Sequence, residues 1–239
     1  MFGLDFINGG YSEAIKLLRQ GKLMHVPSAP GLATINSDKR YAESLRKGDF
    51  AIPDSGYFVL LLKLVKNVKI KKYSGHKFLL QFFENEKLNK GDLFLIDPSS
   101  EESESNNRYL NAIGIPIDVS YHYVAPIYGV GEIEDKCLID RINMLKKKPK
   151  YIMINLGSNV QEPLGCFLKE KLKFKVGIFG TGAAICFLTG TQASISPLVD
   201  NVGLGWFWRC LKNPTKFVPR YLKAIKLYRL TKTERTEIL

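Results

Sequence analysis

The residues best suited to chemistry begin with a carboxylate at the end of a short apolar segment. Residues 51–58 read AIPDSGYF, so Asp54 follows two apolar residues and a proline. In an alternating α/β protein, side chains at a strand tip face a crevice, where a carboxylate can act as a general base. Residues 53–56 are also good turn formers, and by themselves they favour a turn. The rest of the chain decides between these two interpretations.

Two further segments place glycines between an expected strand and an expected helix. Residues 154–162 read INLGSNVQE, and residues 177–190 read GIFGTGAAICFLTG. The first segment ends a strand at Gly157 and opens a helix with Gln161 and Glu162, and the second has Gly180 and Gly182 ahead of a short helix. Amides at helix starts can bind phosphate, so the segments suggest a nucleotide site. Neither is a full G-x-G-x-x-G or P-loop motif, and tight strand–helix packing is an equally good interpretation of each.

The elements that must position these residues alternate along the first three-quarters of the chain. Short apolar runs bounded by Gly, Pro, Asn or Asp predict strands within residues 22–27, 32–36, 49–53, 92–97, 116–124, 150–157 and 174–180. Amphipathic runs, several opening on Ser or Asp, predict helices within residues 12–21, 37–48, 56–67, 74–85, 100–114, 134–148 and 161–172. This alternation predicts an α/β fold with a Rossmann-like, doubly wound and mainly parallel sheet.

Composition narrows the function classes. The 239 residues carry a formal net charge of +12, which favours a polyanionic partner such as nucleic acid, an anionic membrane face or a phosphate-rich substrate. No apolar run reaches the roughly 18–20 residues of a membrane span, and the N-terminus does not resemble a signal peptide. Four scattered cysteines and three isolated histidines predict no disulfide framework and no metal or other cofactor site. They fit a reducing cytoplasm.

The chain changes character near Pro197, which predicts a catalytic domain over residues 1–196 and a basic helical appendage over residues 197–239. The appendage contains nine lysines and arginines. Beside them, aromatic and apolar residues recur at helical spacing, at Phe217, Tyr221, Ile225 and Tyr228. This stripe could pack onto the core, or the helix could lie on an anionic membrane surface, and both can hold if different faces are used. Nucleic acid is disfavoured as a partner, because no nucleic-acid-binding motif accompanies the charge.

Five segments together resemble the WecG/TagA/CpsF family of bacterial glycosyltransferases over essentially the whole chain. In chain order they are TIN (34–36), AIPDSG (51–56), LGSNVQE (156–162), GTGAAICFLTG (180–190) and VGLGWFWRCLKNPTKFVPRYL (202–222). The family shows T-x-N, P-D-G, G-x-P-K-Q-E, a glycine-rich G-A-F-D-F segment and L-G-L-E-W before a basic, aromatic tail. The ordered set with this spacing is more specific than any one motif.

The resemblance implies an inverting, metal-independent transferase that moves a sugar from a UDP-sugar to a polyprenyl-diphosphate-linked acceptor. Asp54 matches the family's proposed general base, and Thr34 and Asn36 match residues that could position the acceptor or the departing phosphate. Gln161 matches a donor-site residue, and Glu162 could orient the first turn of its helix. Arg209 and Arg220 match basic positions that could neutralise diphosphate charge. The protein would then work at the inner face of the cell membrane in surface-polysaccharide or cell-wall polymer synthesis.

The chain also departs from the family pattern. Asn159 and Val160 replace Pro-Lys, which removes a cation from the donor side; Cys186 replaces an aspartate and Gly205 a glutamate. A serine enters P-D-G, and residues 194–197 read SISP where the family has Arg-Ala-Pro. These departures predict a divergent member, whose donor could differ from that of the well-known members; retention of Thr34, Asn36, Asp54, Gln161 and Glu162 favours a change of substrate over a loss of activity.

Two other functions stay open. A non-catalytic protein on the same scaffold could bind a nucleotide or sugar and dock a partner at the membrane, as the changes at positions 160, 186 and 205 allow. A dinucleotide-dependent oxidoreductase would need a glycine fingerprint followed by a ribose-binding acid, and the sequence has neither. Oligomeric state is open as well, with a homo-oligomer as one alternative.

Overall fold

The computed structural model describes residues 1–129, 132–190, 211 and 214–234, without the side chains of residues 216, 217, 220, 221 and 223. Six parallel strands form one sheet in the order β2-β1-β6-β5-β3-β4. The strands are β1 (Leu23–His25), β2 (Phe50–Ala51), β3 (Leu93–Asp97), β4 (His122–Val124), β5 (Tyr151–Ile154) and β6 (Gly177–Gly180). The fold is therefore α/β and Rossmann-like, as the alternation of strands and helices predicts.

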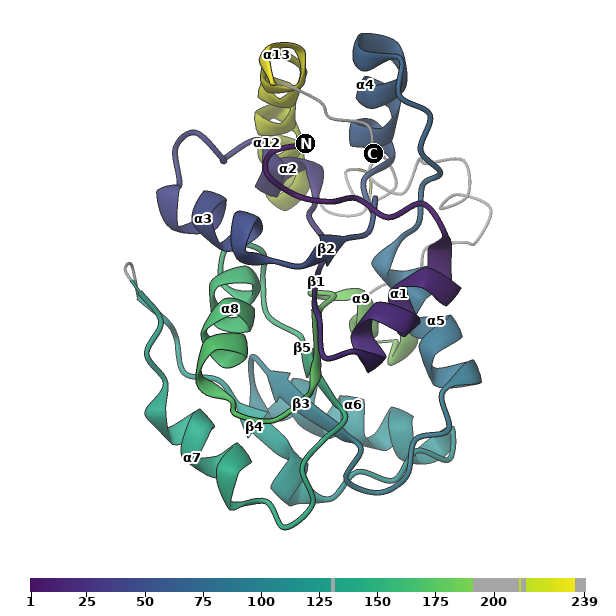
Figure 1. The fold of residues 1–239 in the computed structure, drawn as a ribbon, viewed down its shortest axis with the longest axis vertical. Coiled ribbons are helices and arrows are strands. Elements are labelled where there is room, and N and C mark those ends of the chain that lie inside the picture. The colour runs from purple at the N-terminus through teal and green to yellow at the C-terminus, as the bar shows by residue number, and fades with distance from the viewer. Residues whose placement is uncertain (130–131, 191–210, 212–213, 235–239) are drawn as a thin grey trace.

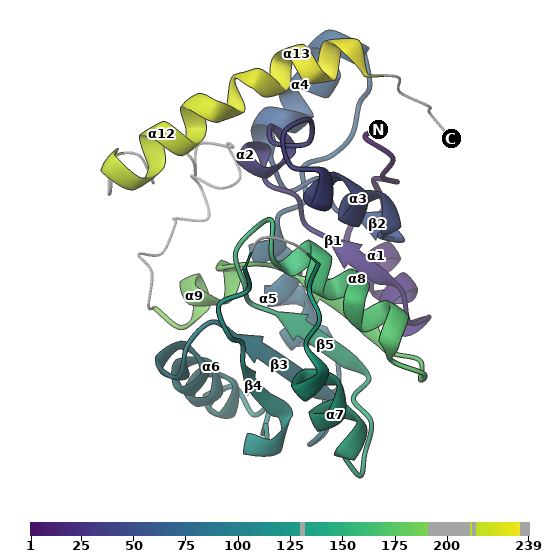
Figure 2. The ribbon, with the colours of Figure 1, turned by 90° about the vertical axis from the view of Figure 1, so that its left-hand side faces the viewer.

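Helices cover both faces of the sheet. They are α1 (Gly10–Arg19), α2 (Ala29–Leu32), α3 (Lys39–Lys47), α4 (Gly56–Lys66), α5 (Gly75–Asn85), α6 (Ser100–Ala112), the 3-10 helix η1 (Val119–Tyr121), α7 (Lys136–Met144), α8 (Gln161–Lys171), α9 (Ala184–Leu188), α12 (Pro214–Ala224) and α13 (Lys226–Thr233). Helices α3, α8 and α7 lie on one face, and α1, α5, α9 and α6 lie on the other (Figure 1). Helices α12 and α13 follow one another across one end of the molecule, above α2 and α4 (Figure 2).

The expected helix starts are confirmed by their caps. Side-chain oxygens of Ser55, Ser74, Ser99, Asp38 and Asp135 accept the backbone N–H three residues ahead, at the starts of α4, α5, α6, α3 and α7. Such a side chain satisfies one of the four amides that a helix leaves without a partner at its N-terminus. These short polar residues therefore mark where the helices begin.

One expected strand, residues 32–36, is wrong. Ser28 accepts the amide of Gly31 and caps α2, and Pro30 stands near its start, where the absent N–H costs nothing. The chain leaves α2 in a series of turns rather than a strand. Leu32, at the end of α2, and Ile35, in the turns that follow, are both buried. Apolar residues at this spacing also fit a strand, which explains the wrong prediction.

Two apolar clusters hold the fold together. The larger one surrounds the sheet, whose strands β1, β2, β3, β5 and β6 are buried along their whole length. The smaller one joins the N-terminal segment, α2, α3 and α4 to Ala224 and Leu227 of the tail. The tail therefore packs onto the α/β part. The division between residues 1–196 and 197–239 stays a prediction.

Candidate functional site

Asp54 lies three residues beyond β2, at the carboxyl edge of the sheet, and its backbone N–H donates to the carbonyl of Ile52 at 2.9 Å in a three-residue turn. Ser55 caps α4 directly after it. The carboxylate is half-buried, and its Oδ1 accepts the backbone N–H of Gly75, the first residue of α5, at 2.9 Å. An amide at a helix N-terminus is a favourable partner for a carboxylate, because it carries the positive end of the helix dipole. Turn and helix start together hold the carboxylate in one orientation.

Gly75 brings Asp54 next to the ends of β1 and β6. A methyl group added at Gly75 would lie 3.1 Å from Cγ1 of Val26 and 3.7 Å from Cβ of Thr181. Val26 directly follows β1, and Thr181 directly follows β6. Asp54 therefore shares this edge of the sheet with the turn that contains Gly180 and Gly182.

Gln161 connects that turn to the start of α8. Its Oε1 accepts the backbone N–H of Gly182 at 2.9 Å, and its Nε2 donates to Oε1 of Glu162 at 3.2 Å. A methyl group at Gly180 would lie 2.8 Å from the same Gln161 oxygen, so only glycine fits. The amide of Gly182, expected to be available for phosphate, is used within the protein. Gly157 differs, because a methyl group there would meet no atom within 4 Å.

Glu162 is almost completely buried and orients the turn before α8. Its Oε2 accepts the backbone N–H of Asn159 at 2.8 Å, and Asn159 has φ of +73°, in the left-handed region. Removal of the carboxylate from water raises the pKa of Glu162 from its usual 4.5 to about 7, against the lowering effect of these hydrogen bonds. The site thus contains one carboxyl group that changes its charge near neutral pH.

Asn159 ties this turn to the segment that follows α2. Its Nδ2 donates to Oδ2 of Asp38 at 2.8 Å and to Oγ1 of Thr34 at 3.2 Å, and Thr34 donates in turn to the carbonyl of Gly31. Thr34 therefore joins the same network as Gln161 and Glu162. Asn36, two residues on, is exposed in the turn and is not part of it.

Arg40 was missed by the sequence analysis. It lies in the first turn of α3, where its Nη2 donates to the carbonyl of Asn159 and its Nη1 to the carbonyl of Gly129, both at 3.1 Å. The guanidinium places a cation beside residues 159 and 160, where the family pattern has a lysine and this chain has none. A lone arginine on an amphipathic helix carries no sequence signal for such a role, because any exposed helix face is rich in charge.

Two further candidate residues, Arg209 and Arg220, belong to the tail. Arg209 lies outside the described residues, and Arg220 lies in α12 without a described side chain. Helix α12 packs against α2, which immediately precedes the Thr34 turn. The tail therefore lies beside the acceptor-side candidates.

A second polar cluster lies at the point in the sheet where the strand order reverses. The connection from β3 leads to β4 and that from β5 leads to β6, on opposite sides, so a crevice is expected at the ends of β3 and β5. Nδ2 atoms of Asn106 and Asn155 both donate to Oδ1 of buried Asp97 at 2.7 Å. Asp97 ends β3 and Asn155 follows β5, the same strand-end signal that marked Asp54, so the sequence could have indicated them.

His122 and Ser103 extend this cluster without forming a catalytic triad. Oγ of Ser103 lies 3.1 Å from Nδ1 of His122, and Oδ2 of Asp97 lies 3.6 Å from the same nitrogen. A triad needs the carboxylate and the hydroxyl on opposite ring nitrogens, so that the imidazole can take the hydroxyl proton. The arrangement therefore supports a structural polar network.

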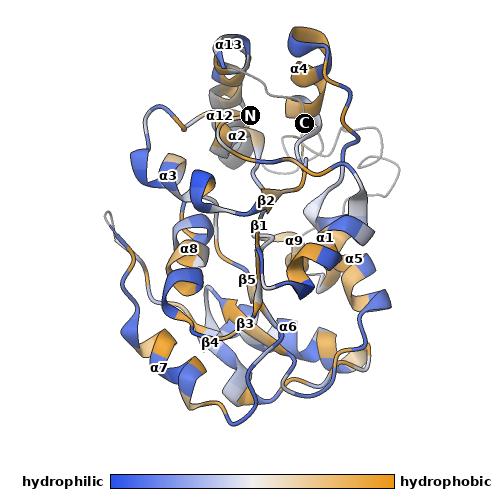
Figure 3. Ribbon diagram, in the orientation of Figure 1, coloured by the Kyte–Doolittle hydropathy of each residue, from blue (hydrophilic) through white to orange (hydrophobic). Residues whose placement is uncertain are grey.

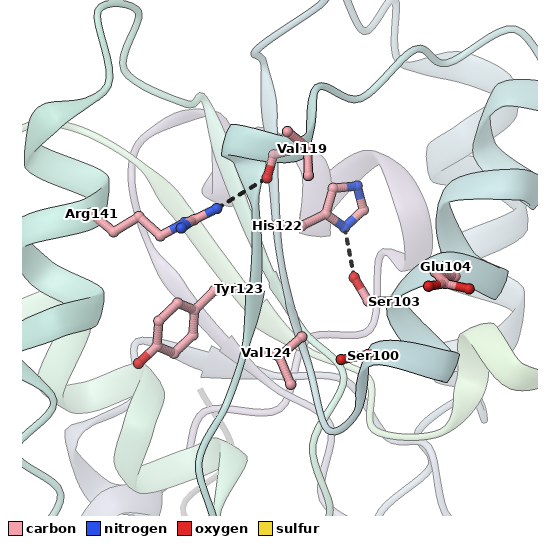
Figure 4. Close-up of a pocket in the computed structure, with 8 residues that line it drawn as sticks. All are labelled: Ser100, Ser103, Glu104, Val119, His122, Tyr123, Val124 and Arg141. Carbon is pink, nitrogen blue, oxygen red and sulfur yellow. Dashed lines mark hydrogen bonds between the residues drawn. The ribbon is translucent and has the colours of Figure 1, made fainter.

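A shallow hollow of about 370 Å³ runs along the outer edge of β4 (Figure 4). His122 and Ser103 lie on one side of the strand, and Tyr123 lies on the other beside Arg141, which donates to the carbonyl of Val119. None of the site residues expected from the sequence lines it. The candidate site is therefore the network around Asp54, Gln161 and Thr34.

Cys186, at the position of a family aspartate, is buried in α9. Its thiol donates to Oε2 of Glu102 of α6 at 3.5 Å. A carboxylate therefore still lies at this place, but it comes from another helix.

Comparison with known proteins identifies the family of the chain. The model of the glycosyl transferase WecG/TagA/CpsF family matches residues 1–237, and no curated protein matches the chain. In the part of the chain that the structure describes, no helix is both long and apolar enough to cross a membrane. The chain therefore belongs to the WecG/TagA/CpsF family of glycosyltransferases.

Proposed function

We propose that this protein transfers a sugar, with inversion and without a metal ion, from a UDP-sugar to a polyprenyl-diphosphate-linked saccharide. The product would serve the synthesis of a surface polysaccharide or cell-wall polymer. The observation that carries the proposal is an arrangement in which Asp54 binds the amide of Gly75 close to Thr181, while hydrogen bonds lead from Gly182 through Gln161, Glu162 and Asn159 to Thr34. It joins most of the family-matched residues at one edge of the sheet.

The chemistry follows from where Asp54 lies. A sugar hydroxyl is a weak nucleophile, so a carboxylate within hydrogen-bond reach takes its proton as the oxygen bonds to the anomeric carbon. The bond from that carbon to the UDP oxygen breaks at the same time on the opposite face, which inverts the configuration. UDP leaves with the electron pair of that bond and the acceptor proton stays on Asp54. The leaving diphosphate gains negative charge, which a nearby cation stabilises.

Arg40 is our candidate for that cation among the described residues. Its two hydrogen bonds to the carbonyls of Gly129 and Asn159 fix the guanidinium beside the turn that precedes Gln161. Arg209 and Arg220 of the tail are proposed to meet the diphosphate of the acceptor, as the family resemblance implies.

Replacement of Arg40 by alanine is expected to lower kcat/KM for the UDP-sugar about 10- to 100-fold, the effect of losing hydrogen bonds to a charged group. Arg40→Lys keeps the charge but cannot reach both carbonyls, so its kcat/KM should lie between those of the wild type and Arg40→Ala. Arg46→Ala, an exposed arginine on the same helix, is the matched control. Equal kinetics for Arg40→Ala and Arg46→Ala would remove Arg40 from the site.

The tail supports a membrane-bound acceptor. Ala224 and Leu227 are buried against the smaller apolar cluster, whereas Val218, Leu222 and Ile225 are exposed. At 100° per residue the exposed positions lie roughly opposite the buried ones. Of the two alternatives for the aromatic stripe, packing onto the core does not apply to Ile225 and Tyr228, which are both exposed, so different faces serve packing and solvent. An exposed apolar face beside lysines and arginines favours an anionic membrane surface as partner.

Release of UDP tests the proposal directly. The protein is incubated with a panel of UDP-sugars, with and without a short-chain polyprenyl-diphosphate-linked saccharide, in the presence of EDTA. We expect one donor to release UDP only when the acceptor is present. Lack of release from every donor by folded protein would contradict the transferase. Nucleotide binding without turnover would favour instead the binding protein that docks a partner at the membrane.

A further inference from the structure

Helix α4 has a second apolar face that nothing in the described structure covers. Phe58, Leu61 and Leu62 are buried in the smaller apolar cluster, but Leu60 is 48% exposed and Leu64 is 71% exposed. Leu60 and Leu64 are one turn apart and point away from the buried side of the helix. Figure 3 shows α4 mostly in the colour of hydrophobic residues, interrupted by lysines.

The charge along the segment that contains α4 has one sign. Residues 55–83 contain no aspartate or glutamate and contain six lysines, which are Lys63, Lys66, Lys69, Lys71, Lys72 and Lys77. Four of them, at positions 63, 69, 71 and 77, are exposed. Exposed leucines among lysines, in a segment without acidic residues, complement a surface that is anionic outside and apolar beneath.

Helix α4 is joined to the tail. Nζ of Lys66 donates to the carbonyls of Lys232 at 3.1 Å and Glu234 at 2.5 Å. These hydrogen bonds attach the C-terminal end of α13 to α4. Both helices lie at the same end of the molecule, opposite α7 (Figures 1 and 2). Arg229 and Lys232 of α13 are exposed there as well. The two helices can therefore meet one flat surface together.

Helix α4 also begins two residues after Asp54. Its eleven residues extend over about 16 Å, too short to cross a bilayer but long enough to lie within the headgroup region. Ser55 caps the helix and Asp54 is anchored to Gly75, so there is no flexible linker between this helix and the carboxylate. A membrane contact of α4 would therefore bring Asp54 to the depth of a lipid diphosphate.

We propose that α4 is a second lipid-binding helix, which inserts Leu60 and Leu64 into an anionic bilayer surface while the lysines around it bind lipid phosphates. The inference rests on the proposed function for the identity of the lipid-linked acceptor, but the binding itself is independent of transfer. The tail and α4 hold the protein at two places, so that the sheet edge with Asp54 faces the bilayer in one orientation.

Vesicle co-sedimentation of the full chain tests this proposal without donor or acceptor. Wild-type protein should bind vesicles that contain anionic phosphatidylglycerol and should bind pure phosphatidylcholine vesicles much more weakly. The double variant Leu60→Ser/Leu64→Ser should bind the anionic vesicles at least tenfold more weakly. The matched control is Val119→Ser/Ile127→Ser, which changes two exposed apolar residues near the β4 edge, away from α4. The control should bind like the wild type.

Each other outcome overturns the proposal. Equal binding of the Leu60/Leu64 variant would assign vesicle binding to the tail alone, and an equal loss in the Val119/Ile127 variant would show a non-specific effect. A change from dimer to monomer in the Leu60/Leu64 variant with unchanged vesicle binding would assign the face to a second copy of the chain. Acceptor-dependent UDP release is measured separately on a water-soluble acceptor, where the Leu60/Leu64 variant should match the wild type. Failure of the transferase proposal is thereby distinguished from failure of this one.

Discussion

Replacement of Asp54 by asparagine is expected to reduce turnover on the order of 10²- to 10⁴-fold, the usual contribution of a general base. The amide cannot accept the acceptor's proton at neutral pH. Its oxygen can still accept the backbone N–H of Gly75, so the free energy of unfolding should change by about 1 kcal/mol or less. Initial rates of UDP release at saturating donor and acceptor measure the first effect, and thermal unfolding measures the second.

Asp140→Asn is the matched control, because Asp140 is an exposed carboxylate on α7, at the other end of the molecule. It should turn over like the wild type. Near-wild-type turnover of Asp54→Asn would contradict the assignment of Asp54 as base and return the AIPDSG segment to a simple turn. A folded Asp54→Asn variant without turnover, beside an active Asp140→Asn, would support the assignment.

The second large effect is on stability and comes from Glu162. Burial raises the pKa of its carboxyl group from 4.5 to about 7 in the folded protein. The folded state therefore holds the proton more tightly than the unfolded state between these two pH values. The stabilising contribution of the protonated form is complete below about pH 4.5 and is lost as the pH rises to about 7. Between pH 5 and 8 the wild type should lose about 2–3 kcal/mol of unfolding free energy through this group.

Glu162→Gln isolates this contribution, because glutamine cannot ionise and still offers an oxygen to the amide of Asn159. Denaturant unfolding of both proteins from pH 5 to 8 gives the comparison, and titrations that the two proteins share cancel in the difference. The wild-type curve should fall relative to that of the variant as the pH rises. Parallel curves would show that the Glu162 carboxyl titrates normally and that water reaches it.

Much of the secondary structure could be predicted because its causes are local. Alternation of apolar runs and amphipathic segments depends on side chains within a few residues, and Ser or Asp at a helix start depends on amides three residues ahead. All seven helical ranges and six of the seven strand ranges expected from the sequence overlap an element of the expected kind. The exception, residues 32–36, shows the limit of this approach. Ser28 and Pro30 start a helix there, and the apolar residues that follow are buried in turns.

The candidate site was predictable only in part. Asp54, Gln161 and Glu162 stand at the ends of expected strands, so their place in the chain indicates an edge of the sheet. Arg40 has no such signal, because its partners Gly129 and Asn159 are 89 and 119 residues away. Long-range contacts of this kind depend on the strand order, which the alternation of elements does not specify.

The tail shows the same division between local and tertiary causes. Helical spacing and basic charge determined that residues after 213 form amphipathic helices. Which face is buried was decided by the fit of Ala224 and Leu227 against α2 and α4, and this leaves Ile225 exposed. The sequence by itself therefore determined most of the elements, because these depend on neighbours along the chain, and the family, because its motifs follow one another in order. The tertiary structure alone decided which residues meet and which apolar faces stay open, because burial depends on segments that are distant in sequence.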